Sequence, residues 1–297
     1  MLEFRLKVFH VVARRLSFSK AARDLGLTQP AVTHQVKQLE DQYGVSLFDR
    51  FTNRIELTPA GAMLVERLEK LMDAAEQVEE EIRAFQDQRV GVLKIGASST
   101  IGAYLLPPAL AAMKKRNPGV DLKVSVGNSD EIVAWLSDHI LDIGIVEGPV
   151  NAGKLIRAPY ADDELVVAVS PNHPAAKKGK ISVAALAREP FIIREEGSGT
   201  RSFIDGLVKN DVINIPNENI VLELGSTTAI KNAVREGMGV SIVSLKALEN
   251  EVALGVLAAL RVEGRPMVRK LQFLVREGRT RSSLISEFMD ICREKTA

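Results

Sequence analysis

Apolar residues recur at helical spacing in the first forty-five positions of the chain. The first apolar face consists of Leu2, Leu6, Phe9, Ala13 and Leu16, at steps of three and four residues. Two further faces are formed by Phe18, Ala21, Ala22 and Leu25 and by Val32, Val36, Leu39 and Tyr43. Glycines at positions 26 and 44 follow the second and third faces, and glycine accepts the left-handed backbone of a helix terminus. The pattern therefore predicts three short helices.

The third predicted helix carries polar side chains opposite its apolar face. These are Gln29, Pro30, Thr33, His34 and Lys37. A polar-faced helix after a tight glycine turn is typical of a helix-turn-helix, whose second helix enters the major groove of DNA. An amide at position 29 and a hydroxyl at position 33 suit contacts with base edges. The alternative is a three-helix segment that only packs against other helices.

The segment from Phe48 to Leu57 predicts a hairpin beside these helices. Thr52 and Asn53 lie between apolar positions, as turn residues do. Such a hairpin forms a wing that places Arg50 and Arg54 next to DNA phosphates. Arg50 has an alternative role as a structural ion-pair partner.

A long helix is predicted to follow, with Thr58 as its cap and Pro59 in its first turn. Its apolar residues alternate steps of four and three over three heptads, at Leu64, Leu68, Leu71, Ala75, Val78, Ile82 and Phe85. A narrow seam on a charged helix requires a partner. We expect a second copy of the chain, since two-fold symmetric DNA sites are bound by two-fold symmetric proteins. Packing on the rest of the same chain is the alternative.

The remaining two thirds of the chain alternate short apolar runs with amphipathic helix patterns. The predicted strands are 92–95, 122–126, 143–146, 165–169, 191–193, 220–224 and 240–243. This order predicts an α/β fold with largely parallel sheets.

Four of these strands run into turns rich in serine and threonine. The polar residues in or beside these turns are Ser98, Ser99, Thr100, Asn128, Ser129, Ser198, Thr200, Arg201 and Thr227. Each turn places hydroxyls and free backbone N–H groups at a helix N-terminus, which favours an anionic ligand. Any single turn is better explained by helix capping alone. Two turns in each half predict a ligand cleft between two lobes.

The predicted domains follow from these patterns. A DNA-binding domain covers residues 1–58, a coiled-coil linker helix 59–90 and an effector-binding domain 91–297. The chain is expected to cross between lobes near 161–162 and to return near 264–266. Lobe I then comprises 91–161 and 266–297, and lobe II comprises 162–265.

Composition narrows the function. Residues 1–58 carry nine lysines and arginines against six acidic residues, a net charge of +3, which is weak support for DNA binding. No apolar run is long enough for a membrane helix, and the N-terminus lacks a signal-peptide core, so we expect a cytoplasmic protein without membrane contacts. One cysteine and four histidines without metal spacing predict no metal, no cofactor and no enzyme activity.

The first sixty residues resemble the LysR-type transcriptional regulators. The resemblance rests on Ala21-Ala22-Arg23-Asp24-Leu25, on Thr28-Gln29-Pro30-Ala31-Val32-Thr33, on Gly44 to Arg50 and on Leu57-Thr58-Pro59-Ala60-Gly61. It extends over the whole chain and implies a winged helix-turn-helix, a linker helix and a two-lobed effector domain like a periplasmic binding protein. It further implies tetramers built from dimers. We also expect contact with RNA polymerase at a nearby promoter, as a consequence of changed DNA contacts. A solute-binding protein with the same two-lobed fold is the alternative.

The effector domain is most similar to the CysL-like branch associated with sulfur assimilation, with the CbbR-like branch of carbon fixation nearby. The supporting stretches are 97–102, 146–149, 194–201 and 223–231. The resemblance implies effector contacts from the first two turns, from Glu147 and from the turn at Thr200. Because Glu147 is an awkward lining for an anion, we expect it to pair with Arg201 or to meet the amino group of a zwitterionic effector. The effector is expected to shift the balance between two lobe arrangements and so to change the DNA contacts.

Overall fold

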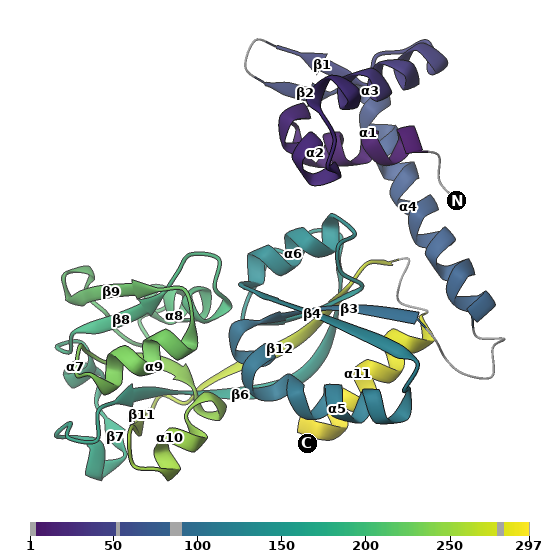
Figure 1. The fold of residues 1–297 in the computed structure, drawn as a ribbon. Coiled ribbons are helices and arrows are strands. Elements are labelled where there is room, and N and C mark those ends of the chain that lie inside the picture. Colours follow the sequence, from purple (N-terminus) through teal and green to yellow (C-terminus); the bar gives the residue numbers. More distant parts are fainter. Residues whose placement is uncertain (1–3, 52–53, 84–90, 278–281, 297) are drawn as a thin grey trace. The chain divides into compact units, whose positions relative to one another are not determined.

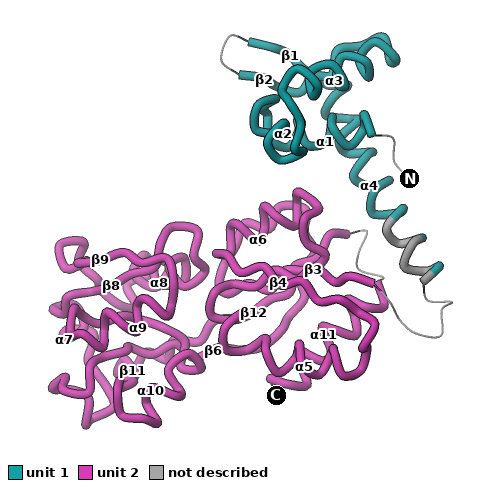
Figure 2. The backbone as a smooth tube through the Cα atoms, in the orientation of Figure 1, with its two compact units in different colours: residues 1–87 teal, residues 88–297 magenta. Residues whose placement is uncertain are grey.

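The computed structural model describes residues 4–51, 54–83, 91–277 and 282–296, and its secondary structure is drawn in Figure 1. The chain forms two compact units, residues 1–87 and residues 88–297 (Figure 2), which we describe in turn. We call the first the DNA-binding unit and the second the effector unit.

Three helices open the DNA-binding unit: α1 (Phe4–Arg15), α2 (Phe18–Leu25) and α3 (Gln29–Tyr43). Ser17 caps α2 by accepting a hydrogen bond from the backbone of Lys20, and Thr28 caps α3 by accepting one from Ala31. Gly26 and Gly44 end the two helices with left-handed backbones, at φ 65° and 67°. The predicted helix starts and stops are confirmed.

A hairpin and a long helix complete this unit: β1 (Phe48–Arg50), β2 (Ile55–Leu57) and α4 (Pro59–Arg83). β1 and β2 pair antiparallel, as a wing does. The predicted turn at Thr52 and Asn53 lies outside the described residues. Thr58 caps α4 by accepting from Gly61 N at 3.0 Å. Gly61 is required there, because a Cβ atom would lie 2.1 Å from the carbonyl oxygen of Leu47.

The apolar seam of α4 divides into a packed part and an exposed part. Leu68 is buried in the core formed by the three helices and the wing, and Leu64 packs against it. Leu71, Val78 and Ile82 are exposed. Phe85, the last predicted seam residue, lies outside the described residues. The second half of the seam therefore has no apolar cover among the parts of the chain that the structure describes.

Lobe I of the effector unit is a sheet covered on both faces. Its elements are β3 (Gly91–Ser98), a π-helical turn (Ile101–Leu105), α5 (Leu106–Arg116), β4 (Val120–Gly127), α6 (Ser129–Ser137), β5 (Ile143–Glu147) and α11 (Ser283–Thr296). β3 pairs parallel with both β4 and β5. α5 and α11 share one apolar core with the sheet, and α6 contributes to a second core with β5 (Figure 1).

Lobe II has a similar layered design. Its elements are β7 (Lys180–Ile181), α7 (Val183–Leu186), β8 (Phe191–Arg194), α8 (Gly199–Lys209), β9 (Ile220–Leu224), α9 (Thr227–Arg235), β10 (Ser241–Ser244), α10 (Glu249–Ala253) and β11 (Ala258–Val262). α7 and α8 cover one core and α9 covers another. β8 pairs parallel with β9, and an isolated parallel bridge joins Phe191 to Val240, the residue before β10.

Two long antiparallel strands join the lobes: β6 (Ile156–Val169) and β12 (Met267–Val275). Tyr160 of β6 belongs to the lobe I core and Leu165 to a lobe II core. The expectation of largely parallel sheets was wrong, because β12 also pairs antiparallel with β5, and β10 and β11 pair antiparallel with β6. Charged residues at Asp162, Asp163 and Glu164 break the apolar run of β6, so the sequence indicated only its second half as a strand.

Candidate functional site

The polar turns predicted from the sequence meet where lobe I faces lobe II. Ser99 and Thr100 follow β3, and Thr227 begins α9 of lobe II. The hydroxyl of Thr227 lies 3.5 Å from that of Ser99 and 3.3 Å from that of Thr100. Tyr104 extends the contact, with its hydroxyl 3.5 Å from that of Thr228. A line of hydroxyl groups thus connects the lobes along one side of the site.

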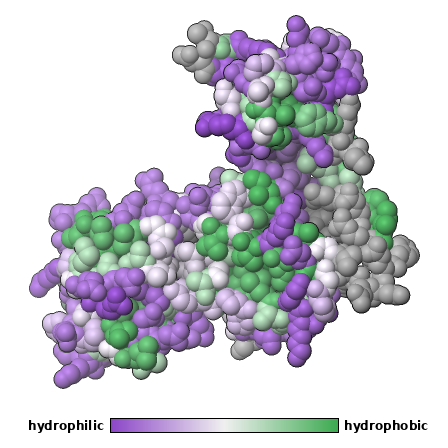
Figure 3. All heavy atoms as spheres, in the orientation of Figure 1, coloured by the Kyte–Doolittle hydropathy of each residue, from purple (hydrophilic) through white to green (hydrophobic). Residues whose placement is uncertain are grey.

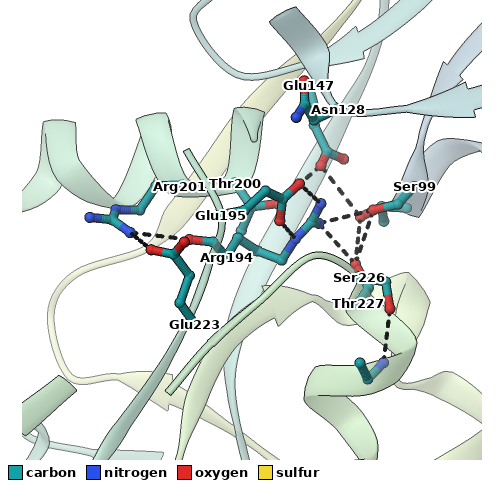
Figure 4. A network of polar contacts seen from close by, with 12 residues as sticks. Ser99, Asn128, Glu147, Arg194, Glu195, Thr200, Arg201, Glu223, Ser226 and Thr227 are labelled. Carbon is teal, nitrogen blue, oxygen red and sulfur yellow. Dashed lines mark hydrogen bonds and ion pairs between the residues drawn. The ribbon is translucent and has the colours of Figure 1, made fainter. Parts of the chain in front are cut away.

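Arg194, the last residue of β8, lies at the centre of these hydroxyls (Figure 4). Its Nη1 donates to Ser99 Oγ at 2.9 Å and to Thr227 Oγ1 at 3.3 Å. Its Nε and Nη2 each donate to one carboxylate oxygen of Glu195, both at 2.7 Å. The guanidinium therefore contacts residues of both lobes, and its side chain is only 3% exposed.

A second arginine is also buried where the two lobes meet. Arg269 of β12 donates from Nε to Asp163 Oδ2 at 2.8 Å, and its Nη2 lies 3.0 Å from Glu147 Oε2. Its Nη1 donates to Thr200 Oγ1 at 2.8 Å. Thr200 in turn donates to Glu147 Oε1 at 3.0 Å. Glu147 ends β5 of lobe I and Asp163 lies on β6, so Arg269 ties together both lobes and the strands that join them.

Two carboxylates around one arginine give this buried group a net negative charge when both are ionised. Burial raises the pKa of Asp163 above its ordinary value, while the charge of Arg269 and a 2.6 Å hydrogen bond from Ser244 oppose that shift. The raised pKa favours the protonated form of Asp163. Arg194, by contrast, donates to the hydroxyl line from Nη1 and pairs with the Glu195 carboxylate through Nε and Nη2.

On the other side of the site, backbone groups of lobe I and lobe II lie in direct contact. Asn128 caps α6 in a reciprocal capping box with Glu131, and Ser129 Oγ donates to the carbonyl of Glu147 at 3.4 Å. The N–H of Asp130 donates to the carbonyl of Gly197 in lobe II at 3.3 Å. Gly199 allows this approach, because a Cβ atom there would lie 1.7 Å from the carbonyl oxygen of Glu147.

Two hydroxyls at the site are buried without a hydrogen-bond partner among the described residues. These are Ser98 Oγ at the end of β3 and Ser198 Oγ at the start of α8. Buried hydroxyls are normally satisfied by hydrogen bonds, so these two are exceptions. Within the described ranges, no group of histidine, cysteine or acidic residues is placed to hold a metal ion.

Arg201 is the predicted site residue whose charged group pairs with carboxylates outside the cluster around Arg194 and Glu147. Its Nε donates to Asp205 at 3.0 Å. Its Nη1 donates to Glu223 at 3.3 Å and to the carbonyl oxygen of Arg194 at 3.1 Å (Figure 4). The expected ion pair between Glu147 and Arg201 is therefore wrong, since Arg269 holds Glu147 instead. Arg201 lies in the first turn of α8 and is drawn outward by Asp205, four residues later on the same helix.

Arg194, Asp163 and Arg269 were not among the site residues predicted from the sequence. Arg194 ends an apolar strand directly before a predicted ligand turn, which was the available signal. Asp163 and Arg269 lie on the two joining strands, 106 positions apart along the chain. A pairing of that range leaves no local pattern.

In the DNA-binding unit, the predicted base-contacting residues share one side of α3. Gln29, Pro30, His34 and Lys37 are exposed and Thr33 is half-buried, whereas Val32 and Val36 face the core. The exposed face of α3 is polar and Thr28 caps the N-terminus of the helix, as expected of a recognition helix.

The wing arginines both have protein partners. Arg50 lies 3.1 Å from Glu40 and stacks over the ring of Phe18 at 5.0 Å. Arg54 lies 3.2 Å from Glu56 and over the ring of Phe51. Arg54 is the more available of the two, with 69% of its side chain exposed against 43% for Arg50.

Both units match known protein families. Residues 4–62 match the bacterial regulatory helix-turn-helix protein family of lysR type, and residues 86–297 match the LysR substrate binding domain. The helix-turn-helix match disfavours the alternative of a solute-binding protein. In the described part of the chain, no helix is both long enough and apolar enough to cross a membrane.

Curated relatives match over almost the full length. The uncharacterized HTH-type transcriptional regulator YeiE of Escherichia coli is 35% identical over 97% of this chain and 96% of its own. The HTH-type transcriptional regulator CysL of Bacillus subtilis is 33% identical over 91% of this chain and 89% of its own.

Solved structures agree with the fold. A full-length OxyR variant from Pseudomonas aeruginosa superposes with a TM-score of 0.72 at 25% identity, over 99% of this chain and 95% of that one. The CcmR regulatory domain of Synechocystis in complex with 2-PG gives a TM-score of 0.62 at 31% identity, over 69% of this chain and 96% of that one. The winged helix-turn-helix, the linker helix and the two-lobed α/β domain predicted from the sequence are thereby confirmed. The chain belongs to the LysR family of DNA-binding transcriptional regulators, with an effector-binding domain after its helix-turn-helix.

Proposed function

We propose that the effector unit binds a small anionic or zwitterionic molecule between lobe I and lobe II. The main support for this proposal is the buried guanidinium of Arg194, which contacts hydroxyls from both lobes. A guanidinium and hydroxyl donors suit a carboxylate, sulfate or phosphate group. Glu147 and Asp163 on the far side suit an ammonium group, which favours a zwitterion such as an amino-acid precursor.

We propose further residue roles at the same site. Ser98 and Ser198 contribute their unpartnered hydroxyls, while Ser99, Thr100 and Thr227 orient the ligand through the hydroxyl line. Asn128, Ser129 and Thr200 fix the walls on which the two lobes meet. Arg201 acts on the outside of α8, through Asp205 and Glu223.

Effector binding regulates transcription by shifting the balance between lobe arrangements. A ligand changes that balance only by its different affinity for the two arrangements. The exposed face of α3 carries the base contacts, through Gln29, Thr33 and His34, and Pro30 fixes the first turn. Lys37, Arg50 and Arg54 contact phosphates. The altered DNA contacts then change the access of RNA polymerase to a nearby promoter.

Self-association follows from apolar surface that the chain leaves uncovered. Leu71, Val78 and Ile82 extend along α4 and support a dimer through that helix. Figure 3 shows apolar surface on the effector unit as well, and exposed valines lie on its edge strands, at Val124 and Val126 of β4 and Val221 of β9. A second self-association surface on the effector unit supports a tetramer built from dimers.

The regulated pathway is proposed to be sulfur assimilation, on the resemblance to the CysL-like branch. A thermal-shift screen of the full chain tests both the pathway and the site. The ligands are sulfate, sulfite, thiosulfate, phosphate, O-acetylserine, sugar phosphates and 2-PG. A ligand at a hundred times its dissociation constant stabilises the folded protein by about 2.7 kcal/mol, which a melting curve resolves.

Ser98→Ala is the matched site variant. Its hydroxyl has no partner among the described residues, so its removal is expected to weaken the ligand while the melting temperature of the unliganded protein stays unchanged. Ser286→Ala, an exposed position on α11, is the control. A ligand that stabilises the wild-type chain and the Ser98→Ala variant equally would place binding elsewhere. Stabilisation by 2-PG alone would move the pathway away from sulfur.

A further inference from the structure

The side chain that holds Arg194 comes from the next residue in the chain. Glu195 accepts two parallel hydrogen bonds from the forked Nε and Nη2 face of Arg194, both at 2.7 Å. This is the geometry in which a guanidinium binds the carboxylate of another molecule. The forked face is thus already occupied by an oxyanion that belongs to the protein.

The two partners differ in how firmly each is held. Arg194 is 3% exposed and is fixed from its other edge by Ser99 and Thr227. Glu195 is 22% exposed and lies after the end of β8, where no strand or helix constrains it. Among the described residues its carboxylate contacts only Arg194. Glu195 is therefore able to swing into water, whereas Arg194 stays in place.

We infer that Glu195 is an internal competitor, whose carboxylate occupies the forked face of Arg194 to which the effector's own oxyanion binds. This inference rests on the proposed effector site and specifies how that site is regulated. Binding exchanges one charge-assisted pair for another, and the released Glu195 carboxylate becomes hydrated. The intramolecular competitor sets the effector concentration at which the regulator responds.

The size of the effect follows from occupancy. The apparent association constant is the intrinsic constant multiplied by the fraction of molecules in which the binding face is free. If Glu195 occupies Arg194 in about nine of ten molecules, the effector binds about tenfold more weakly than it does to an uncovered arginine.

The test compares Glu195→Gln with Glu196→Gln in the full-length chain. Both variants remove one negative charge from the same turn, but Glu196 is exposed and does not contact Arg194 among the described residues. Each protein is titrated by calorimetry with sulfate, phosphate and O-acetylserine, which separate a divalent inorganic oxyanion from a carboxylate. We expect the dissociation constant to fall about tenfold for Glu195→Gln. For Glu196→Gln it is expected to stay within about twofold of the wild-type value, because only distant screened charge is lost.

Two outcomes separate this inference from the proposed site. If the wild-type chain binds a probe and Ser98→Ala weakens it, but Glu195→Gln binds no more tightly, the competitor is overturned while the site stands. If no probe binds either the wild-type chain or Glu195→Gln, the forked face does not accept oxyanions, and both ideas fail. Glu195→Asp, which keeps the charge on a shorter side chain, gives a smaller gain in the same direction and replaces Glu195→Gln should that variant not fold.

Discussion

The two wing arginines, Arg50 and Arg54, lie at the surface with one carboxylate each, whereas Arg194 and Arg269 of the effector site are buried among several partners. Arg50 and Arg54 expose 43% and 69% of their side chains. Arg194 and Arg269 expose 3% and 0%. A surface arginine exchanges its partner for a phosphate at little cost. A buried arginine is required by the carboxylates around it, so its removal changes the stability of the fold as well as the ligand site.

The largest expected effect is the loss of Arg269. Arg269→Ala leaves Glu147 and Asp163 as two buried carboxylates without their cation, which lowers the free energy of unfolding by about 3–5 kcal/mol. Denaturant unfolding of the full chain measures it, with Arg261→Ala as the control for an exposed pair with Glu164. Equal losses from the two variants would remove the distinction between buried and surface arginines.

Arg54→Ala is expected to act on DNA rather than on stability. Loss of one phosphate contact lowers the slope of log affinity against log salt by about 0.9 and weakens all DNA sequences alike. Binding titrations at several salt concentrations measure the slope, with unrelated DNA as the control. A loss confined to one base position would show instead that Arg54 contacts a base.

Arg50→Ala tests whether the two wing arginines differ in their contribution to stability. Arg50 combines an ion pair to Glu40 with stacking on Phe18, so its removal lowers the free energy of unfolding by about 0.5–1 kcal/mol. Arg54→Ala serves as the reference in the same unfolding experiment. If the two variants unfold at the same denaturant concentration, the contacts of Arg50 contribute nothing measurable.

The smallest effect concerns pH. Burial holds the pKa of Asp163 above its ordinary value of 3.8, so the folded protein binds this proton more tightly than the unfolded chain does. Stability from this group is present below pH 3.8 and is lost as the pH rises through the folded pKa. Asp163→Asn lacks that loss, so the stability of wild type relative to the variant should fall with rising pH. A constant difference between the two unfolding curves would show that the pKa is not raised.

The sequence predicted the DNA-binding unit in more detail than the effector site, because the determinants of the two regions have different range. Thr28, Pro30 and Gly44 define α3 within a short stretch of chain, through caps and turns that act locally. The hydroxyl turns of the effector unit were found for the same reason. The pairing of Arg269 with Glu147 and Asp163 depends on strands that alternate charged and apolar residues, and on a fold that brings them together. The prediction for Arg201 failed for a local reason. Arg201 was expected to pair with Glu147, but it pairs with Asp205, four residues later on the same helix.

A substitution at Gly199 is expected to change how the two lobes of the effector unit meet. Its α-carbon lies so close to the backbone of lobe I that one added methyl group has no room beside Glu147. Alanine at this position is expected to push the lobes apart, because its Cβ atom would clash with the Glu147 backbone and would also lie 2.7 Å from the Ser129 hydroxyl. The change leaves the charge of the site as it is. A cell that carries such a variant reports the transcriptional output of the separated lobes directly, whatever molecule normally governs them.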